Sequence, residues 1–200
     1  MPKPIFSGDQ IIHYTVKHDI IYRTASTVED LRQILKLQQE NLPQALSSTE
    51  KEAEGFLTVH HSFEILKRMN DRCPHIIATH DNRVVGYTLC MLEEFKNDIP
   101  VLVSMFTEID NTLRMLQKSH LKYLIMGQVC VAKAYRKQGI FRGLYEFMRT
   151  GLNPVFDAVI TEVDAENVRS SNAHKAVGFE MLKTYTSKGK HWELIIWNWR

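Results

Sequence analysis

The sequence predicts an α/β (α+β) fold in which helices flank a mixed central sheet of about six to seven strands. A nearly unbroken apolar run over Tyr123–Val131 leads through a short basic link into apolar residues at helical spacing, which is typical of a buried strand that runs into a helix. Two β-rich runs flank Asp81-Asn82 within His75–Leu92, the pattern of a hairpin. The carboxyl end, Phe179–Trp199, repeats that pattern around a Ser-Lys-Gly-Lys turn.

Length and composition favour one domain over residues 1–200, because 200 residues with 44% hydrophobic content suit a single full core. The formal net charge of +2 is too near neutral to indicate a nucleic acid or an anionic membrane as partner. The cysteines Cys73, Cys90 and Cys130 are odd in number and widely spaced, so we expect buried free thiols, not a disulfide framework or a zinc site. The sequence has no signal peptide and no apolar run of ~18 residues, which favours a cytoplasmic protein.

The amino end predicts strands followed by an amphipathic helix. The β-rich runs Ile11–Val16 and Ile20–Tyr22 form a hairpin, or one strand after a loose arm. The helix begins after Ser26 or Thr27, either of which can cap it, and ends near Pro43.

A polar connection at residues 47–52 leads to a second helix from about Ser62 to Asn70. Beyond the hairpin, residues 93–122 have the weakest pattern of the chain. They contain a short apolar run, Val101–Phe106, and a possible helix over Asp110–Gln117.

The last part of the chain alternates strand and helix. The helix after the Tyr123–Val131 strand ends at Gly151–Pro154, and Asp157–Val163 forms the fifth strand. A short helix over Asn167–Val177 is stopped by Gly178.

The junction Arg136-Lys137-Gln138-Gly139, with Gly143 four residues on, makes the first turn of its helix basic and sterically open. Free N–H groups and the positive end of the helix dipole at such a position favour a phosphate by ~0.3–1 kcal/mol, and up to ~2 when partly buried. No G-x-x-x-x-G-K-[ST] pattern occurs, which excludes a Walker P-loop.

The pattern V-C-V-x-x-x-x-R-x-x-G-I-x-x-x-L over Val129–Leu144 resembles the acetyl-CoA signature of the GNAT acetyltransferase superfamily, whose core is Q/R-x-x-G-x-G/A. Arg136 and Gly139 match, whereas Phe141 stands where the family usually has Gly or Ala, so its side chain is expected to point away from the pyrophosphate and into the sheet. The segment Asn167–Phe179, NVRSSNAHKAVGF, also resembles a family motif, and the order of elements from His75 to Trp199 is that of the GNAT fold.

The resemblance implies transfer of an acetyl group from acetyl-CoA to a primary amine, carried by a small molecule or a peptide, by direct attack in a ternary complex. It implies a cofactor-binding core over residues 123–179, with the amino-terminal third and residues 93–122 shaping the acceptor site. The expected cofactor-binding residues are Val129, Cys130, Val131, Arg136, Lys137, Gln138, Gly139, Ile140, Phe141, Arg142 and Asn167.

Gly127 interrupts the strand, and a glycine there marks a bulge or the close approach of a ligand, or only relieves crowding. The backbone of Val129 and Val131 would then pair with the pantetheine amides. Asn167 and His174 are seven residues apart, so a helix would project both toward the cofactor. Asn167 is alternatively a helix cap, and His174 is either the acid that protonates the departing thiolate, as the family's Tyr does, or a packing residue.

The general base is the open question, because the strand Tyr123–Val131 contains no carboxylate. A lysine-like amine of pKa ~10.4 is neutral in only about one molecule in 2,500 at pH 7, whereas an α-amine of pKa ~8 is about one-tenth neutral. Glu93, Glu94 and Glu162 are the catalytic candidates by element order, and each is alternatively a solvated charge. The adjacent pair His60-His61 does not converge on one point, so no metal site is expected.

Two other functions stay open. The first is a CoA-binding module without catalysis that serves as a sensor or interaction domain. The second is an RNA-binding module that uses basic residues such as Lys133 and Arg149, although surface aromatics in a platform pattern are lacking. The expected partners are therefore an amine acceptor and no nucleic acid or membrane, in a monomer or homodimer.

Overall fold

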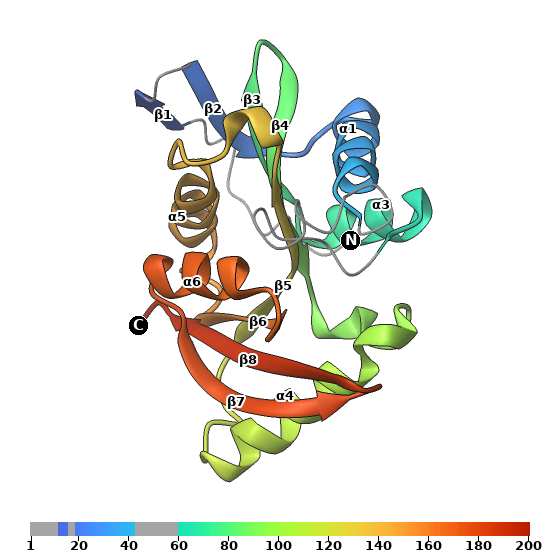
Figure 1. Cartoon of the computed structure of the whole chain (residues 1–200), viewed down its shortest axis with the longest axis vertical. Coiled ribbons are helices and arrows are strands. Elements are labelled where there is room, and N and C mark those ends of the chain that lie inside the picture. Colours follow the sequence, from blue (N-terminus) through green and yellow to red (C-terminus); the bar gives the residue numbers. More distant parts are fainter. Residues whose placement is uncertain (1–11, 16–18, 43–59) are drawn as a thin grey trace.

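The computed structural model describes residues 12–15, 19–42 and 60–200, and these residues form one eight-stranded mixed sheet in the order β1-β2-β3-β4-β5-β6-β8-β7 (Figure 1). Only β5 and β6 pair in parallel; the other neighbours are antiparallel. The strands are β1 (Ile12–Thr15), β2 (Asp19–Thr24), β3 (Ile76–His80), β4 (Arg83–Met91), β5 (Tyr123–Val131), β6 (Ala158–Asp164), β7 (Glu180–Ser187) and β8 (Lys190–Asn198).

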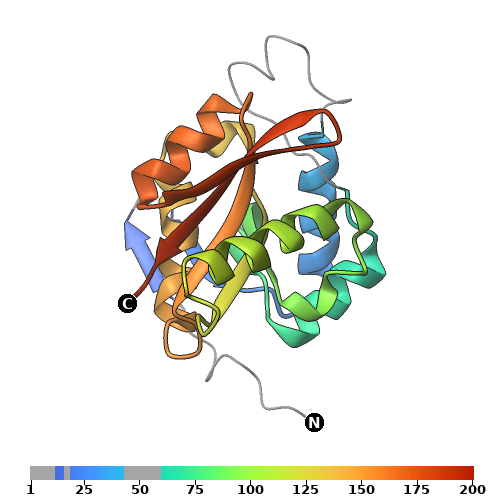
Figure 2. The same ribbon diagram turned by 90° about the horizontal axis from the view of Figure 1, so that it is seen from below.

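Helices cover both faces of the sheet. In Figure 2, α5 and α6 lie on one side, and α1, α3 and α4 lie on the other. Each side has its own buried apolar cluster, so the sheet separates two hydrophobic cores. The described helices are α1 (Val28–Glu40), α3 (Phe63–Arg72), α4 (Val103–Met115), α5 (Ile140–Leu152) and α6 (Val168–Val177), with short 3-10 turns η2 (Glu93–Phe95), η3 (Pro100–Leu102) and η4 (Lys133–Tyr135).

The predicted fold class is confirmed, and the sheet has one strand more than expected because the amino-terminal runs form a complete hairpin. Ile12 pairs with Tyr22 and Thr15 with Asp19. The central hairpin is as predicted: Asp81 and Asn82 both have a positive φ, which is the twist that two-residue hairpin turns require. The carboxyl-terminal hairpin turns at Lys188 and Gly189, also with positive φ.

The helix starts follow from capping. Thr27 and Asp30 form a capping box at α1, and Arg23 holds the same Asp30 carboxylate at 2.7 and 2.8 Å. Ser62 caps α3, which matches the predicted second helix. Asn167 caps α6, and Gly178 ends it. The predicted connection at 47–52 and the stop at Pro43 lie outside the described residues.

Residues 93–122 differ from the prediction. The helix α4 begins at Val103, seven residues before the expected start at Asp110, and it takes up most of the short apolar run. Met105, Phe106 and Ile109 are buried against the sheet, so packing extends a helix whose first turn has no capping side chain.

Candidate active site

The strands β5 and β6 separate after a short parallel ladder. Only three residue pairs join them, the last being Ile125 and Ile160. The Thr161 hydroxyl then donates to the Met126 carbonyl at 2.8 Å, where the strands begin to diverge. Beyond this point no described strand pairs with the β6-facing edge of β5, so backbone groups of that edge face a gap in the sheet.

The β5 strand also bulges beside this gap. Its register with β4 passes from Gln128 opposite Leu89 to Met126 opposite Cys90, which leaves Gly127 out of the ladder, as predicted. A side chain at Gly127 would meet its nearest neighbours at 3.8 Å, an ordinary contact. Steric crowding therefore does not explain the glycine.

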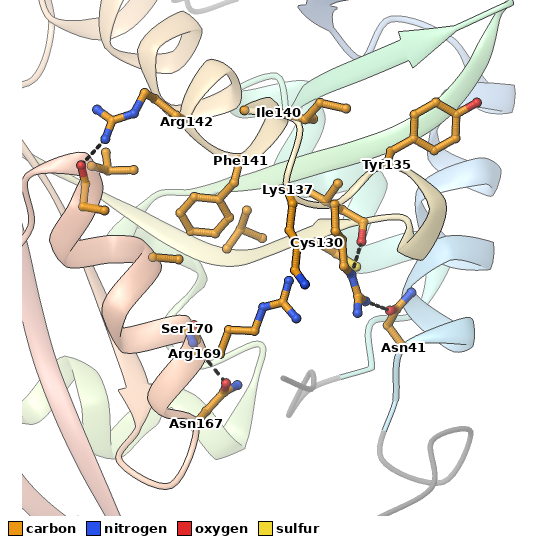
Figure 3. Close-up of a pocket in the computed structure, with 17 residues that line it drawn as sticks. Asn41, Cys130, Tyr135, Lys137, Ile140, Phe141, Arg142, Asn167, Arg169 and Ser170 are labelled. Atoms are coloured by element: carbon orange, nitrogen blue, oxygen red, sulfur yellow. Dashed lines mark hydrogen bonds between the residues drawn. The ribbon is translucent and has the colours of Figure 1, made fainter. Parts of the chain in front are cut away.

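A cavity of about 330 Å³ opens at the diverging strands, between the end of β5, the start of α5 and one face of α6 (Figure 3). All predicted cofactor-binding residues except Gln138 line it. The Gln138 side-chain amide instead donates a hydrogen bond to the Ala134 carbonyl at 3.0 Å. The lining residues that were not predicted are Asn41, Tyr135, Arg169, Ser170, Ala173, Ala176 and Val177.

The turn into α5 is built from two left-handed residues, Lys137 with φ 61° and Gly139 with φ 81°. Gly139 is the amino-terminal cap of α5 and supplies no side chain to the free N–H groups of the first turn. A Cβ at Gly139 would meet nothing within 4 Å, so open space lies directly beside those groups. An anion is the ligand that this arrangement favours.

Basic side chains surround the open turn. Lys137, Arg136, Arg142 and Arg169 all line the cavity. Arg142 reaches across to the Ala176 carbonyl near the end of α6, and Arg136 donates to the Val131 carbonyl at 3.0 Å and to the Asn41 side chain at 2.5 Å. Arg136 thus joins the turn to the end of α1.

Gly143 has a different role from the one its place in the open turn suggested. It does not line the cavity; a Cβ there would overlap the phenol of Tyr22 on β2. The glycine therefore allows α5 to pack closely on the sheet. Phe141 does line the cavity, but its ring packs on Tyr145 and His174 at centroid distances of 5.2 and 5.1 Å, which leaves the turn open.

The structure does not bring His174 into the cavity. Asn167 is the amino-terminal cap of α6, with a non-helical backbone (φ −86°, ψ 62°), so only His174 of the pair lies within the helix. Asn167 itself lines the cavity and accepts the Ser170 N–H at 3.2 Å. His174 is 1% exposed and lies in an aromatic cluster with Phe141, Tyr145 and Phe179.

The three predicted carboxylates have contrasting environments. Glu93 and Glu94 are exposed and pair with Lys96 at 3.1 Å and Arg72 at 2.5 Å, and the bond from Arg72 lowers the pKa of Glu94. Glu162 on β6 is mostly buried, and burial raises its pKa to about 7, although a hydrogen bond from the Tyr185 phenol opposes that rise. Burial thus brings the pKa of Glu162 into the range of proton transfer near neutral pH.

Glu162 also lies at the gap. It follows Thr161 at the point of divergence, two residues after Ile160, which belongs to the core on the α1, α3 and α4 side. Because side chains alternate along a strand, Glu162 is on that same side, opposite the cavity between α5 and α6. The gap therefore has the basic cavity on one face of the sheet and a titratable carboxylate on the other.

The three cysteines are buried free thiols, as predicted, and burial raises the pKa of Cys130 beside the cavity to about 12.

Among the described residues, no group of three or more potential ligands for a metal ion occurs. His61 is buried beside Gln38, whose amide nitrogen lies 2.9 Å from its Nδ1. No helix in the described ranges has the length and apolar character to cross a membrane.

A mixed sheet that splits between two parallel strands, beside a helix start with free N–H groups, is an architecture that suits a phosphate-bearing ligand. The model of the acetyltransferase (GNAT) family matches residues 31–179, and the protein belongs to this family. No curated protein matches the chain significantly.

Solved structures share the fold at low sequence identity. One is a chain of the NatC complex bound to Gag peptide and CoA, with 18% identity, a TM-score of 0.61, and coverage of 90% of this chain and 98% of that one. A second is NAA60 of Arabidopsis thaliana in complex with acetyl-CoA, with 14% identity, a TM-score of 0.62, and coverage of 90% and 99%. A third is the ribosomal-protein-S18-alanine N-acetyltransferase of Escherichia coli, with 12% identity, a TM-score of 0.59, and coverage of 90% and 93%. At these identities the similarity establishes the fold.

Proposed function

We propose that the protein transfers an acetyl group from acetyl-CoA to a primary amine by direct attack in a ternary complex. The observation that carries this proposal is the gap between β5 and β6, which opens beside a basic helix start on one face of the sheet and has Glu162 on the other. Membership of the acetyltransferase family supports the choice of acetyl-CoA as donor.

The cavity fits the donor in two parts. The N–H groups of the first turn of α5, with Lys137 and Arg142 close by, suit the pyrophosphate. The edge of β5 at Val129 and Val131, which pairs with no described strand, suits the amides of pantetheine, which would extend the sheet in place of a strand. One of these N–H groups would also face the oxyanion that develops during attack, an interaction worth ~3–4 kcal/mol where it has been measured.

Glu162 is the general base in this proposal. Its pKa of about 7 lets a large fraction ionise at neutral pH while the carboxylate keeps the basicity to accept a proton. The amine nitrogen forms a bond to the thioester carbonyl carbon, and the carbon–sulfur bond breaks. An ammonium acceptor loses two protons in all: one leaves through Glu162, and the other ends on the CoA thiol.

The acceptor enters from the face that carries Glu162. On that side α1 and α4 flank the gap, and the NatC complex, one chain of which shares this fold, is bound to both Gag peptide and CoA in its crystal structure. A peptide amine and a small-molecule amine are both compatible with this arrangement.

Calorimetry with acetyl-CoA, followed by mass spectrometry of a panel of peptide α-amines, lysine side chains and small amines, tests the proposal. We expect saturable binding and acetylation of at least one amine class. Glu162→Gln should keep the affinity for acetyl-CoA within about twofold and lower the transfer rate by roughly 10²–10⁴-fold. Binding without transfer to any amine would instead support a non-catalytic CoA-binding module, and absence of binding would refute both.

A further inference from the structure

The phenol of Tyr185 on β7 donates a hydrogen bond to Oε2 of Glu162 on β6, although a third strand separates the two. In the register of the sheet, Glu162 lies opposite Leu194 of β8, and Tyr185 lies opposite Trp192 two residues away. The side chain of Tyr185 therefore reaches diagonally over β8. Figure 1 shows β7 and β8 as the two strands at the α4 end of the sheet.

The strand β7 is also tied to α4. Lys183, two residues before Tyr185, pairs with Glu108 of α4 at 2.5 Å. α4 belongs to the segment inserted between β4 and β5, and it packs over this part of the sheet. The position of the Tyr185 phenol is thus set both by its strand and by the helix that flanks the acceptor side of the gap.

The direction of the hydrogen bond is fixed at ordinary pH. Burial, and then Glu162, raise the pKa of Tyr185 far above its usual value, while the Ser104 hydroxyl of α4 opposes this rise. The phenol therefore stays protonated, and remains the hydrogen-bond donor, throughout the neutral pH range. Two charged groups of the described residues lie near the pair: Glu108, which also raises the pKa of Tyr185, and its partner Lys183.

We propose that Tyr185 is a positioning residue for Glu162: its hydroxyl holds one carboxylate oxygen, so that the other faces the gap as a proton acceptor. This inference rests on the proposed role of Glu162 as general base. The bond favours the charged carboxylate, since a donor stabilises the ionised form more than the neutral one. Without it, Glu162 would be protonated over more of the neutral pH range and its carboxylate would rotate.

Tyr185→Phe removes only the hydroxyl, and Tyr123→Phe is the matched control. Tyr123 lies on β5, on the same side of the sheet, and its buried hydroxyl has no hydrogen-bond partner among the described residues. The pKa of Glu162 can be followed by carbon-13 NMR of the glutamate carboxyl groups, with Glu162→Gln to assign the resonance. This measurement requires no enzymatic activity.

In Tyr185→Phe we expect the pKa of Glu162 to rise by about 1, which would lower the ionised fraction at pH 7 about fivefold. The acid limb of kcat/KM should move by the same amount, and most of the rate should return at pH 9. Ser104→Ala should produce a smaller shift in the same direction, and Tyr123→Phe should change neither property. Melting temperatures identify any variant that does not fold.

An unchanged pKa of Glu162 in Tyr185→Phe would overturn the inference, and so would a rate that falls equally at every pH. Failure of the proposed function has a different signature. A wild-type protein that binds acetyl-CoA and acetylates no amine would refute the base role, while the NMR titration would still decide whether Tyr185 controls Glu162.

Discussion

The hydroxyl of Tyr145 lies 2.7 Å from Nε2 of His174, and Nδ1 of the same ring lies 2.7 Å from the Ser170 carbonyl oxygen. Since that carbonyl only accepts, Nδ1 carries the ring proton and Nε2 accepts the Tyr145 O–H. Burial lowers the pKa of His174 to about 4, although the Ser170 bond opposes this. Both ring nitrogens are thus occupied by the protein, and the ring is neutral at pH 7, which favours the packing role over the acid role.

His174→Ala should therefore lower stability and not change the chemistry selectively. Removal of a buried ring from an aromatic cluster costs roughly 2–4 kcal/mol, by analogy with large-to-small core substitutions, and Tm should fall by several degrees. Acetyl donors with thiols of different acidity should lose rate by the same factor. A larger loss for the less acidic thiols, at unchanged Tm, would restore His174 as the acid.

Gly139→Asp should reduce the affinity for acetyl-CoA at least tenfold, because it puts a negative side chain into the open space beside the free N–H groups of α5. Gly139→Asn is the matched control. It has nearly the same shape, and Asn tolerates the positive φ of this position better than most residues. Calorimetry should therefore show a clearly smaller loss for Asn than for Asp. Equal losses would mean that shape, and not charge, matters here.

Gly143→Ala should destabilise the protein by roughly 1–3 kcal/mol or more without weakening the cofactor site, because the added methyl group would overlap the Tyr22 phenol. Chemical denaturation measures the first effect, and calorimetry on the folded protein the second. In a double-mutant cycle with Tyr22→Val, the double variant should be more stable than the sum of the single effects. A large loss of affinity for acetyl-CoA would place Gly143 in the phosphate site after all.

Local signals account for the parts of the fold and site that the sequence predicted. The α5 turn, the Asp81-Asn82 hairpin and the Asn167 cap each depend on a few adjacent residues whose backbone preferences agree with the final structure. The cofactor cavity is predictable for the same reason, since most of its lining comes from the Val129–Arg142 stretch.

Contacts between distant residues account for what the sequence did not reveal. Asn41 accepts a hydrogen bond from Arg136, which is 95 residues away in the sequence, and Tyr185 donates one to Glu162 on another strand. No local sequence pattern therefore marks Asn41 or Tyr185. Arg169 was within reach of sequence reasoning, because it lies inside the motif that starts at Asn167. The early start of α4 depends on burial against the sheet, which periodicity over a short apolar run does not specify.

Stability should fall as the pH drops from 7.5 to 5.5, because three buried histidines resist protonation. Burial lowers the pKa of His61 and His174 to about 4 and that of His75 to about 3. Below pH 6.5 the unfolded chain therefore binds protons that the folded protein excludes, and the stability from the neutral rings is lost between pH 6.5 and about 4. Between pH 7.5 and 5.5 each ring should cost about 1.4 kcal/mol, or about 4 kcal/mol for the three.

Glu162 acts in the opposite direction. Its raised pKa means that the folded protein takes up a proton as the pH falls through about 7, which returns at most about 2 kcal/mol. Glu162→Gln removes this compensation, so the loss on acidification should grow from about 2 to about 4 kcal/mol. At 2–4 °C per kcal/mol, the drop in Tm between pH 7.5 and 5.5 should roughly double. Calorimetric scans of both proteins at the two pH values measure it, and an equal drop in both would show that the Glu162 carboxyl does not titrate near pH 7 in the folded protein.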